Sequence, residues 1–247
     1  EGIHANLNDI YAIIETLKET KVFEVALGGG EPTIHPDFLH ILYSLKRKNI
    51  TVNFTTRSLT WMKDKDLRDK ILPQIGSFAY SVTNEKYVRA LGALTEQYFM
   101  HGITPVIHVV VGTISNYELK SILKTSQIYG FSVTLLGFKT TGRGVDFKQQ
   151  SNNWMSVVKS LLETGDCPKL GIDTCLAQQY EQELKEEKIP EYAYTLHEGA
   201  FSCYIDAVEM TMGPSSFCSP EEMKPIGIKS TGKWGQNISK DITEKFK

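Results

Sequence analysis

Three consecutive glycines followed by an acidic residue are the most distinctive chemical feature of this sequence. They form the stretch Gly28-Gly29-Gly30-Glu31-Pro32, directly after a short apolar run that is typical of a β-strand. Glycines let a ligand approach the backbone closely, and a carboxylate among them suits a ligand that carries an ammonium group. A tight strand-to-helix turn with an incidental glutamate explains the same residues, so both interpretations stay open at this point.

The cysteines are the second group of residues that could do chemistry. All four lie in the last third of the chain, at Cys167, Cys175, Cys203 and Cys218. Their spacing matches no zinc finger. Since the chain shows no secretory signal, we favour metal or thiol chemistry over a disulfide framework. Buried structural thiols are the alternative.

A second glycine-rich segment carries two basic residues. It runs from Gly137 to Gly144 and contains Lys139 and Arg143. Such a loop can hold a phosphate or a carboxylate. A flexible surface loop would have the same composition.

Composition and charge limit the classes of partner. The 247 residues are 41% hydrophobic and 23% charged, which is ordinary for a soluble globular protein. With 27 basic and 29 acidic residues the formal charge is −2, so there is no overall basic character for nucleic acid. The longest apolar run is too short to cross a bilayer. We therefore expect a cytoplasmic protein without a nucleic-acid or membrane partner.

A regular repeat of strand-like and helix-like segments must position these residues. Strand-like runs begin near residues 23, 50, 77, 104, 131 and 170, so the first four intervals are 27 residues each and the last is 39. A strand–helix repeat of this size predicts right-handed βαβ units in a parallel sheet. We therefore expect an α/β fold in which helices cover an open or closed barrel.

Ligands in such folds bind at the carboxyl ends of the strands. The glycine turn, Thr55, Ser81, Leu136 and Asp173 all fall there, and Asp173 could either close the mouth of the barrel or cap the next helix. His108 lies within a strand, where we expect a core histidine whose hydrogen bonds are satisfied.

The pattern changes near residue 175. A polar helix is followed by two short strand-like runs between residues 199 and 212 and then by a Lys-, Gly- and Ser-rich tail. This predicts a barrel domain over residues 1–174 and a small extension with a β-hairpin over residues 175–247.

The Gly-Gly-Glu-Pro turn at a strand end, followed by His35-Pro36-Asp37 before a helix, resembles the radical S-adenosylmethionine (SAM) superfamily. The resemblance implies a partial (β/α)6 TIM-like barrel in which the glycine backbone and the glutamate carboxylate bind the methionyl ammonium of SAM. Further cofactor contacts are implied along the later strands. The implied cofactor-binding residues are Gly29, Gly30, Glu31, Pro32, Thr55, Ser81, Leu136, Lys139 and Arg143.

The C-terminal segment resembles the SPASM or twitch extension of peptide-modifying members of that superfamily. The similarity lies in Cys203-Tyr204-Ile205-Asp206 and in Phe217-Cys218-Ser219. The resemblance implies an auxiliary iron–sulfur cluster held by Cys175, Cys203 and Cys218, with Cys167 as a candidate fourth ligand.

One departure from the family stands out. Its defining C-x3-C-x2-C loop, which binds the [4Fe–4S] cluster, is absent, because the 27 residues before Gly28 contain no cysteine. We expect that the first strand and the cluster ligands lie upstream of residue 1. The alternative is a relative that has lost the cluster.

The resemblance implies a radical SAM oxidoreductase or maturase. It would cleave SAM reductively to a 5′-deoxyadenosyl radical, with an electron from a donor such as flavodoxin or ferredoxin, and abstract hydrogen from a small-molecule or peptide substrate. It assigns no catalytic side chain. A cluster-less relative that binds SAM or a nucleotide-like ligand, and an unrelated α/β-barrel enzyme with an anionic substrate, remain as alternatives.

Overall fold

The computed structural model describes residues 3–20, 22–138, 153–197, 199–200, 202–219 and 221–226. The chain forms two compact units, one of residues 1–54, 64–76 and 198–247 and the other of residues 55–63 and 77–197. These units differ from the two predicted domains, residues 1–174 and 175–247, and the predicted boundary after residue 174 stays a prediction.

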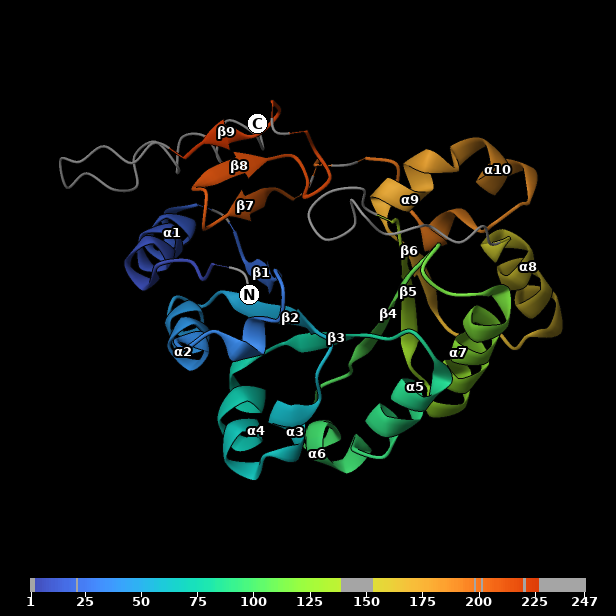
Figure 1. Cartoon of the computed structure of the whole chain (residues 1–247), viewed down its shortest axis with the longest axis horizontal. Coiled ribbons are helices and arrows are strands. Elements are labelled where there is room, and N and C mark those ends of the chain that lie inside the picture. The colour runs from blue at the N-terminus through green and yellow to red at the C-terminus, as the bar shows by residue number, and fades with distance from the viewer. Residues whose placement is uncertain are drawn as a thin grey trace. The chain divides into compact units, whose positions relative to one another are not determined.

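Six strands form one sheet in the order in which they occur along the chain (Figure 1). The pairs β1–β2, β3–β4, β4–β5 and β5–β6 are all parallel. This confirms the predicted α/β fold with parallel strands, and each strand begins within two residues of its predicted start. The strands are β1 (Glu24–Leu27), β2 (Thr51–Thr56), β3 (Ser77–Ser81), β4 (Val106–Val110), β5 (Ser132–Leu136) and β6 (Leu170–Ile172).

Helices follow the strands as the repeat predicts, and two of the strand connections contain two short helices instead of one. Asp64 begins a new helix, because its carboxylate accepts hydrogen bonds from the backbone N–H groups of Asp66 and Leu67. A second break separates Gly92 from Thr95. The helices are α1 (Leu7–Glu19), α2 (Phe38–Arg47), α3 (Thr60–Lys63), α4 (Lys65–Ile71), α5 (Glu85–Gly92), α6 (Thr95–Phe99), α7 (Asn116–Tyr129), α8 (Trp154–Thr164), α9 (Thr174–Gln179) and α10 (Glu181–Glu186), with short 3₁₀ turns η1 (Pro32–Ile34), η2 (Leu72–Gln74) and η4 (Glu191–Ala193).

Burial alternates along the strands of the second unit. One set of alternating side chains is buried, including Tyr80, Ile107, Val109 and Leu135. Each such residue contributes about 1.5–3 kcal/mol to stability. The residues between them are only half-buried, so the sheet has one densely covered face and one more open face. The open face is where polar side chains can meet a ligand.

The first unit has a core of its own. Helices α1 and α2 pack against each other through buried residues such as Leu17 and Leu42. The rings of Phe38 in α2 and Phe54 in β2 lie edge to face, with centroids 5.3 Å apart. This packing anchors β1 and therefore the glycine turn that follows it.

The predicted hairpin is present in the C-terminal segment. Strands β7 (Tyr204–Asp206) and β8 (Thr211–Gly213) pair antiparallel, and β9 (Lys224–Pro225) adds a third strand. A Cβ atom on Gly213 would lie 2.7 Å from Cys218 Sγ and 2.6 Å from Met223 Sδ, so the sulfur atoms occupy the space that a side chain would need. In the described part of the chain, no helix has the length and apolar character that a membrane crossing requires.

Candidate functional site

The glycine turn leaves the carboxyl end of β1 with its backbone open. Gly29 has φ +116°, a conformation that favours glycine. A Cβ atom built on Gly28 or Gly29 would meet no atom within 4 Å, and both residues are exposed. Neither packing nor a positive φ therefore requires glycine at position 28. A backbone that a ligand approaches closely would account for it.

The carboxylate of Glu31 is fixed by its own turn. Its Oε1 accepts hydrogen bonds from the Thr33 hydroxyl at 2.6 Å and from the Thr33 backbone N–H at 3.3 Å. Glu31 is half-buried and caps η1, whose first residue is Pro32. The turn thus holds a negative charge in a defined position, beside an exposed glycine backbone, without help from a ligand.

His35 joins the turn to its neighbours on both sides. Its Nδ1 accepts a hydrogen bond from the backbone N–H of Asp37 at 3.0 Å, and its Nε2 lies 3.2 Å from the carbonyl oxygen of Ala5. Because Nδ1 accepts, Nε2 carries the proton and donates to Ala5. The imidazole therefore fixes the start of α2 to the segment before α1.

In the second unit, Asp173 organises the ends of two neighbouring strands. Its Oδ1 accepts hydrogen bonds from the backbone N–H of Leu176 at 2.8 Å and of Gly137 at 3.1 Å. Of the two roles left open by the sequence, the structure shows the cap of α9. It adds a contact that the sequence did not indicate, because the same oxygen also holds the backbone just beyond β5.

The predicted cofactor-binding residues are divided between the two units. Gly29, Gly30, Glu31 and Pro32 belong to the first unit. Thr55 in β2, Ser81 at the end of β3 and Leu136 at the end of β5 belong to the second, and all three are half-buried. Lys139 and Arg143 lie outside the described residues. The cofactor role of each residue stays a prediction.

A row of residues crosses the more open face of the second unit's strands. The strand register pairs Ser81 with His108, His108 with Thr134, and Thr134 with Gly171. Paired residues on parallel strands place their side chains on the same face. All four are half-buried, so the row presents a hydroxyl, an imidazole and a second hydroxyl side by side.

His108 differs from the satisfied core histidine that the sequence predicted. Its Nδ1 is enclosed and, among the described residues, has no hydrogen-bond partner. Burial lowers the pKa of His108 to about 4, so the ring is neutral at pH 7. A single histidine in an apolar strand gives no signal of this kind, because its partners are set by the register of neighbouring strands.

The cysteines are also divided. Cys203 and Cys218 belong to the first unit, and Cys167 and Cys175 to the second. Burial raises the pKa of Cys167 to about 11, which favours its thiol form over the thiolate that ligates metals. Within the described ranges no three His, Cys, Asp or Glu side chains gather as a metal site. The auxiliary cluster stays a prediction.

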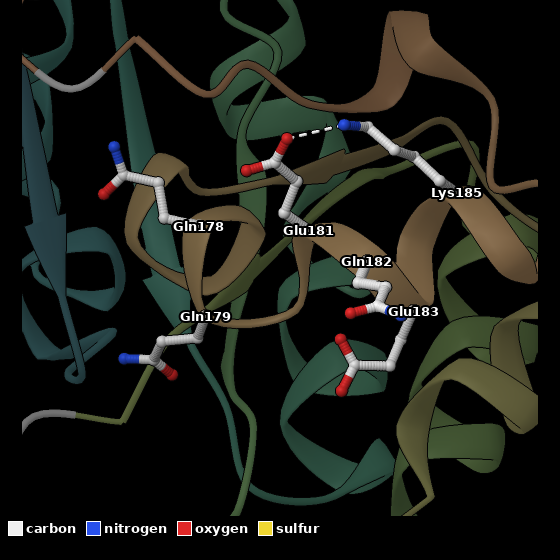
Figure 2. A pocket seen from close by; sticks show the side chains of 6 residues that line it. All are labelled: Gln178, Gln179, Glu181, Gln182, Glu183 and Lys185. Carbon is white, nitrogen blue, oxygen red and sulfur yellow. Dashed lines mark hydrogen bonds and ion pairs between the residues drawn. The ribbon is translucent and has the colours of Figure 1, made fainter.

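Two surface depressions in the second unit lack the features of a cofactor site. The larger, about 410 Å³, is lined on α9 and α10 by polar side chains alone, and the exposed pair Glu181 and Lys185 lies across it at 2.6 Å (Figure 2). The smaller, about 260 Å³, surrounds Cys167 with apolar residues such as Leu170 and Ile189. Neither combines an apolar lining with convergent polar groups in the way that ligand pockets do.

Comparison with known proteins gives sequence relatives over about half of the chain. Over 145 residues the chain is 26% identical to mycofactocin maturase MftC of Mycobacterium ulcerans and 25% identical to MftC of Mycobacterium tuberculosis. The matched stretch is 54% of this chain but only 39% and 37% of those relatives. The chain thus spans well under half of the curated proteins that it matches. No protein-family model matches it.

Solved structures share the fold over nearly the whole chain. Streptococcus suis SuiB matches with a TM-score of 0.64 at 15% identity, over 97% of this chain and 58% of SuiB. Native anSMEcpe, solved with bound AdoMet and the Kp18Cys peptide, matches with a TM-score of 0.57 at 11% identity, over 98% of this chain and 76% of its own. Together, the MftC sequence relationship and the shared fold support the assignment of this chain to the radical SAM superfamily.

Proposed function

We propose that this chain is part of a radical SAM enzyme that modifies a peptide. The observation that carries the proposal is the turn after β1, where an exposed glycine backbone adjoins a carboxylate that Thr33 fixes in place. The peptide substrate is suggested by the relatives, since MftC is named a maturase and both SuiB and anSMEcpe have been solved with bound peptides.

The residues of the turn fit the amino-acid end of SAM. The ammonium group needs an anion and hydrogen-bond acceptors, which the Glu31 carboxylate and the carbonyl groups of the exposed glycines provide. Glu31 is only half-buried, so pairing with a cation does not require full desolvation of its charge. In this proposal Thr33 keeps the carboxylate in place and thereby reduces the ordering that SAM binding would need.

The chemistry itself would come from the bound groups. With a [4Fe–4S] cluster and one electron from a donor such as flavodoxin or ferredoxin, SAM supplies the radical that abstracts hydrogen from the substrate. The four cysteines of this chain do not form the family's C-x3-C-x2-C loop. We therefore assign no ligand of this [4Fe–4S] cluster to the chain. The role of the glycine turn and Glu31 in this proposal is limited to binding and orienting SAM.

The test is the affinity for SAM of a Glu31→Gln variant, measured by calorimetry or equilibrium dialysis. Glutamine keeps an oxygen that can accept from Thr33, so the turn is preserved while the charge is lost. We expect SAM affinity to fall about 10-fold or more, in line with the about 1.5–3 kcal/mol of a charged hydrogen bond. Glu19→Gln, which removes an exposed charge at the end of α1, should leave the affinity unchanged.

Unchanged affinity in Glu31→Gln would remove the SAM-site assignment and favour an unrelated barrel enzyme. A separate measurement addresses catalysis. Anaerobic reconstitution with iron and sulfide of the protein together with any sequence encoded upstream of residue 1, followed by detection of 5′-deoxyadenosine, distinguishes a radical enzyme from a relative that only binds SAM or a nucleotide-like ligand.

A further inference from the structure

The row Ser81, His108 and Thr134 has no role in the SAM site described above, apart from the predicted cofactor contact of Ser81. It consists of three neighbouring polar side chains on the more open face of β3, β4 and β5. Within the described part of the chain, no hydrogen bond of their side chains is recorded. A buried polar atom without a partner, such as Nδ1 of His108 among the described residues, calls for an explanation, and a nearby ligand site is one.

The two ring nitrogens of His108 are not equivalent. Nδ1 is enclosed and has no partner among the described residues, whereas Nε2 is not enclosed in this way. An orphaned buried N–H group is rarer in proteins than an acceptor with unused capacity. The proton of the neutral ring therefore belongs on Nε2, which leaves an N–H donor on the side of the ring that is not enclosed.

The row carries no formal charge. Its members are two hydroxyl groups and an imidazole that burial keeps neutral at pH 7. An anionic ligand would need a cation here, and a cationic ligand would need a carboxylate. A neutral N–H donor flanked by two hydroxyl groups instead suits an uncharged polar group, of which the peptide amide is the most common in a peptide substrate.

Their positions separate His108 and Thr134 from the predicted cofactor contacts at the strand ends. Leu136, a predicted cofactor contact, is the last residue of β5, and Thr134 lies two residues before it on the same face. His108 likewise lies two residues before the end of β4. His108 and Thr134 thus lie one pleat deeper in the sheet than the strand ends, whereas Ser81 is the last residue of β3.

Gly171 completes the row and leaves space beside Thr134. A Cβ atom there would make only ordinary contacts with Thr134, at 3.6 and 3.9 Å, so packing does not require glycine. The absence of a side chain keeps the end of the row open. A larger residue at position 171 should therefore fill the site without a severe clash.

We propose that His108, flanked by Ser81 and Thr134, binds an uncharged amide of the substrate, with its Nε2–H donating to the amide carbonyl oxygen. The role as a substrate site rests on the proposed peptide-modifying function. The binding chemistry does not, because it follows from the row itself.

The experiment uses the full chain labelled with ¹⁵N-histidine and follows the His108 ring signal by NMR, assigned by its loss in His108→Leu. Two probes are compared at equal concentration and neutral pH: N-methylacetamide, which is an uncharged amide, and acetate, which carries a carboxylate and no amide. We expect the uncharged probe to shift the His108 signal in a saturable way, and the carboxylate probe to leave it in place.

Variants show whether the row of Ser81, His108 and Thr134 causes the shift that the uncharged probe produces. Gly171→Val should weaken or abolish the shift while the His108 ring stays neutral, and this variant keeps the test valid if His108→Leu fails to fold. His101→Leu, which replaces an exposed histidine after α6, should leave the response unchanged. SAM alone should not shift the His108 signal, and His108→Leu should keep the SAM affinity of the unaltered chain.

Three results would overturn the proposal. The first is no shift of the His108 signal with the uncharged probe, and the second is an equal shift with the carboxylate probe. The third is a shift of the His108 signal with SAM together with lost SAM affinity in His108→Leu, which would make His108 a cofactor residue. None of these depends on Glu31→Gln. A failure of the SAM site and a failure of the amide site are therefore distinguishable.

Discussion

The side chains that matter most for the candidate site differ in how completely the protein satisfies their hydrogen bonds. The carboxylates of Glu31 and Asp173 each accept the two hydrogen bonds described above. Both donors to Glu31 belong to Thr33, which lies only two positions away along the chain. His35 and His108 differ in this respect, because His35 braces a turn through both nitrogens, whereas Nδ1 of His108 has no partner within the described part of the chain.

The low pKa of His108 has a measurable effect on stability. The folded-state pKa is about 4, below the ordinary value of 6.5, so as pH falls the unfolded chain takes up this proton first. The neutral histidine costs nothing above pH 6.5, and stability is lost as pH falls from 6.5 toward 4. In urea unfolding, we expect the unaltered chain to lose up to about 1.4 kcal/mol more per pH unit than His108→Asn in this window.

His101→Asn is the matched control for this prediction, because His101 is exposed. It should retain the pH dependence of the unaltered chain. If His108→Asn and the unaltered chain show the same slope, His108 is not held neutral by burial.

At the scale of elements, short-range signals determine where the helices begin and end. Helix α7 begins with a capping box, in which Ser115 accepts from the Glu118 backbone and Glu118 accepts from the Ser115 backbone. The helix ends at Gly130 with φ +71°. The first cap lies between β4 and α7 and the second lies directly before β5, so together they fix the connection from β4 to β5.

Removal of this cap should destabilise the protein measurably. We expect Ser115→Ala to lower the free energy of unfolding by about 1 kcal/mol, because the backbone N–H of Glu118 loses its partner, the Ser115 hydroxyl. Chemical denaturation with an unchanged m-value would measure it. Ser121→Ala, inside the same helix, should have little effect or stabilise slightly, since alanine is the better helix former. Equal losses in the two variants would argue against the cap.

At the scale of the whole molecule, the chain combines a parallel sheet with a small antiparallel one. The C-terminal sheet carries Cys203 before β7 and Cys218 after β8, and the Cys218 thiol donates to the Ser215 carbonyl oxygen at 2.8 Å. Cys218 Sγ also lies 3.3 Å from Met223 Sδ. Two of the cysteines named in the SPASM-like interpretation thus belong to this segment, and the auxiliary cluster stays a prediction.

Iron content tests that prediction. After anaerobic reconstitution with iron and sulfide, we expect the double variant Cys203→Ala/Cys218→Ala to bind less iron and to lose part of the visible absorbance. Cys167→Ala should keep the full iron load, because burial holds this residue as a thiol. A full iron load in the double variant would remove the auxiliary cluster, and a loss in Cys167→Ala would make Cys167 the fourth ligand.

The sequence alone determined the strand–helix repeat, the parallel α/β fold, the glycine turn at the end of β1 and the C-terminal hairpin. These features depend on local patterns, namely hydrophobic periodicity and turn residues, that each segment carries by itself. Only the tertiary structure decided the second hydrogen bond of Asp173 and the enclosed Nδ1 of His108, which has no partner among the described residues. These depend on strand register and packing between segments far apart in the chain, and a single sequence does not encode them in a readable pattern. The row of Ser81, His108 and Thr134 is the clearest case, since 26 or 27 residues separate each member from the next and only the sheet brings them together.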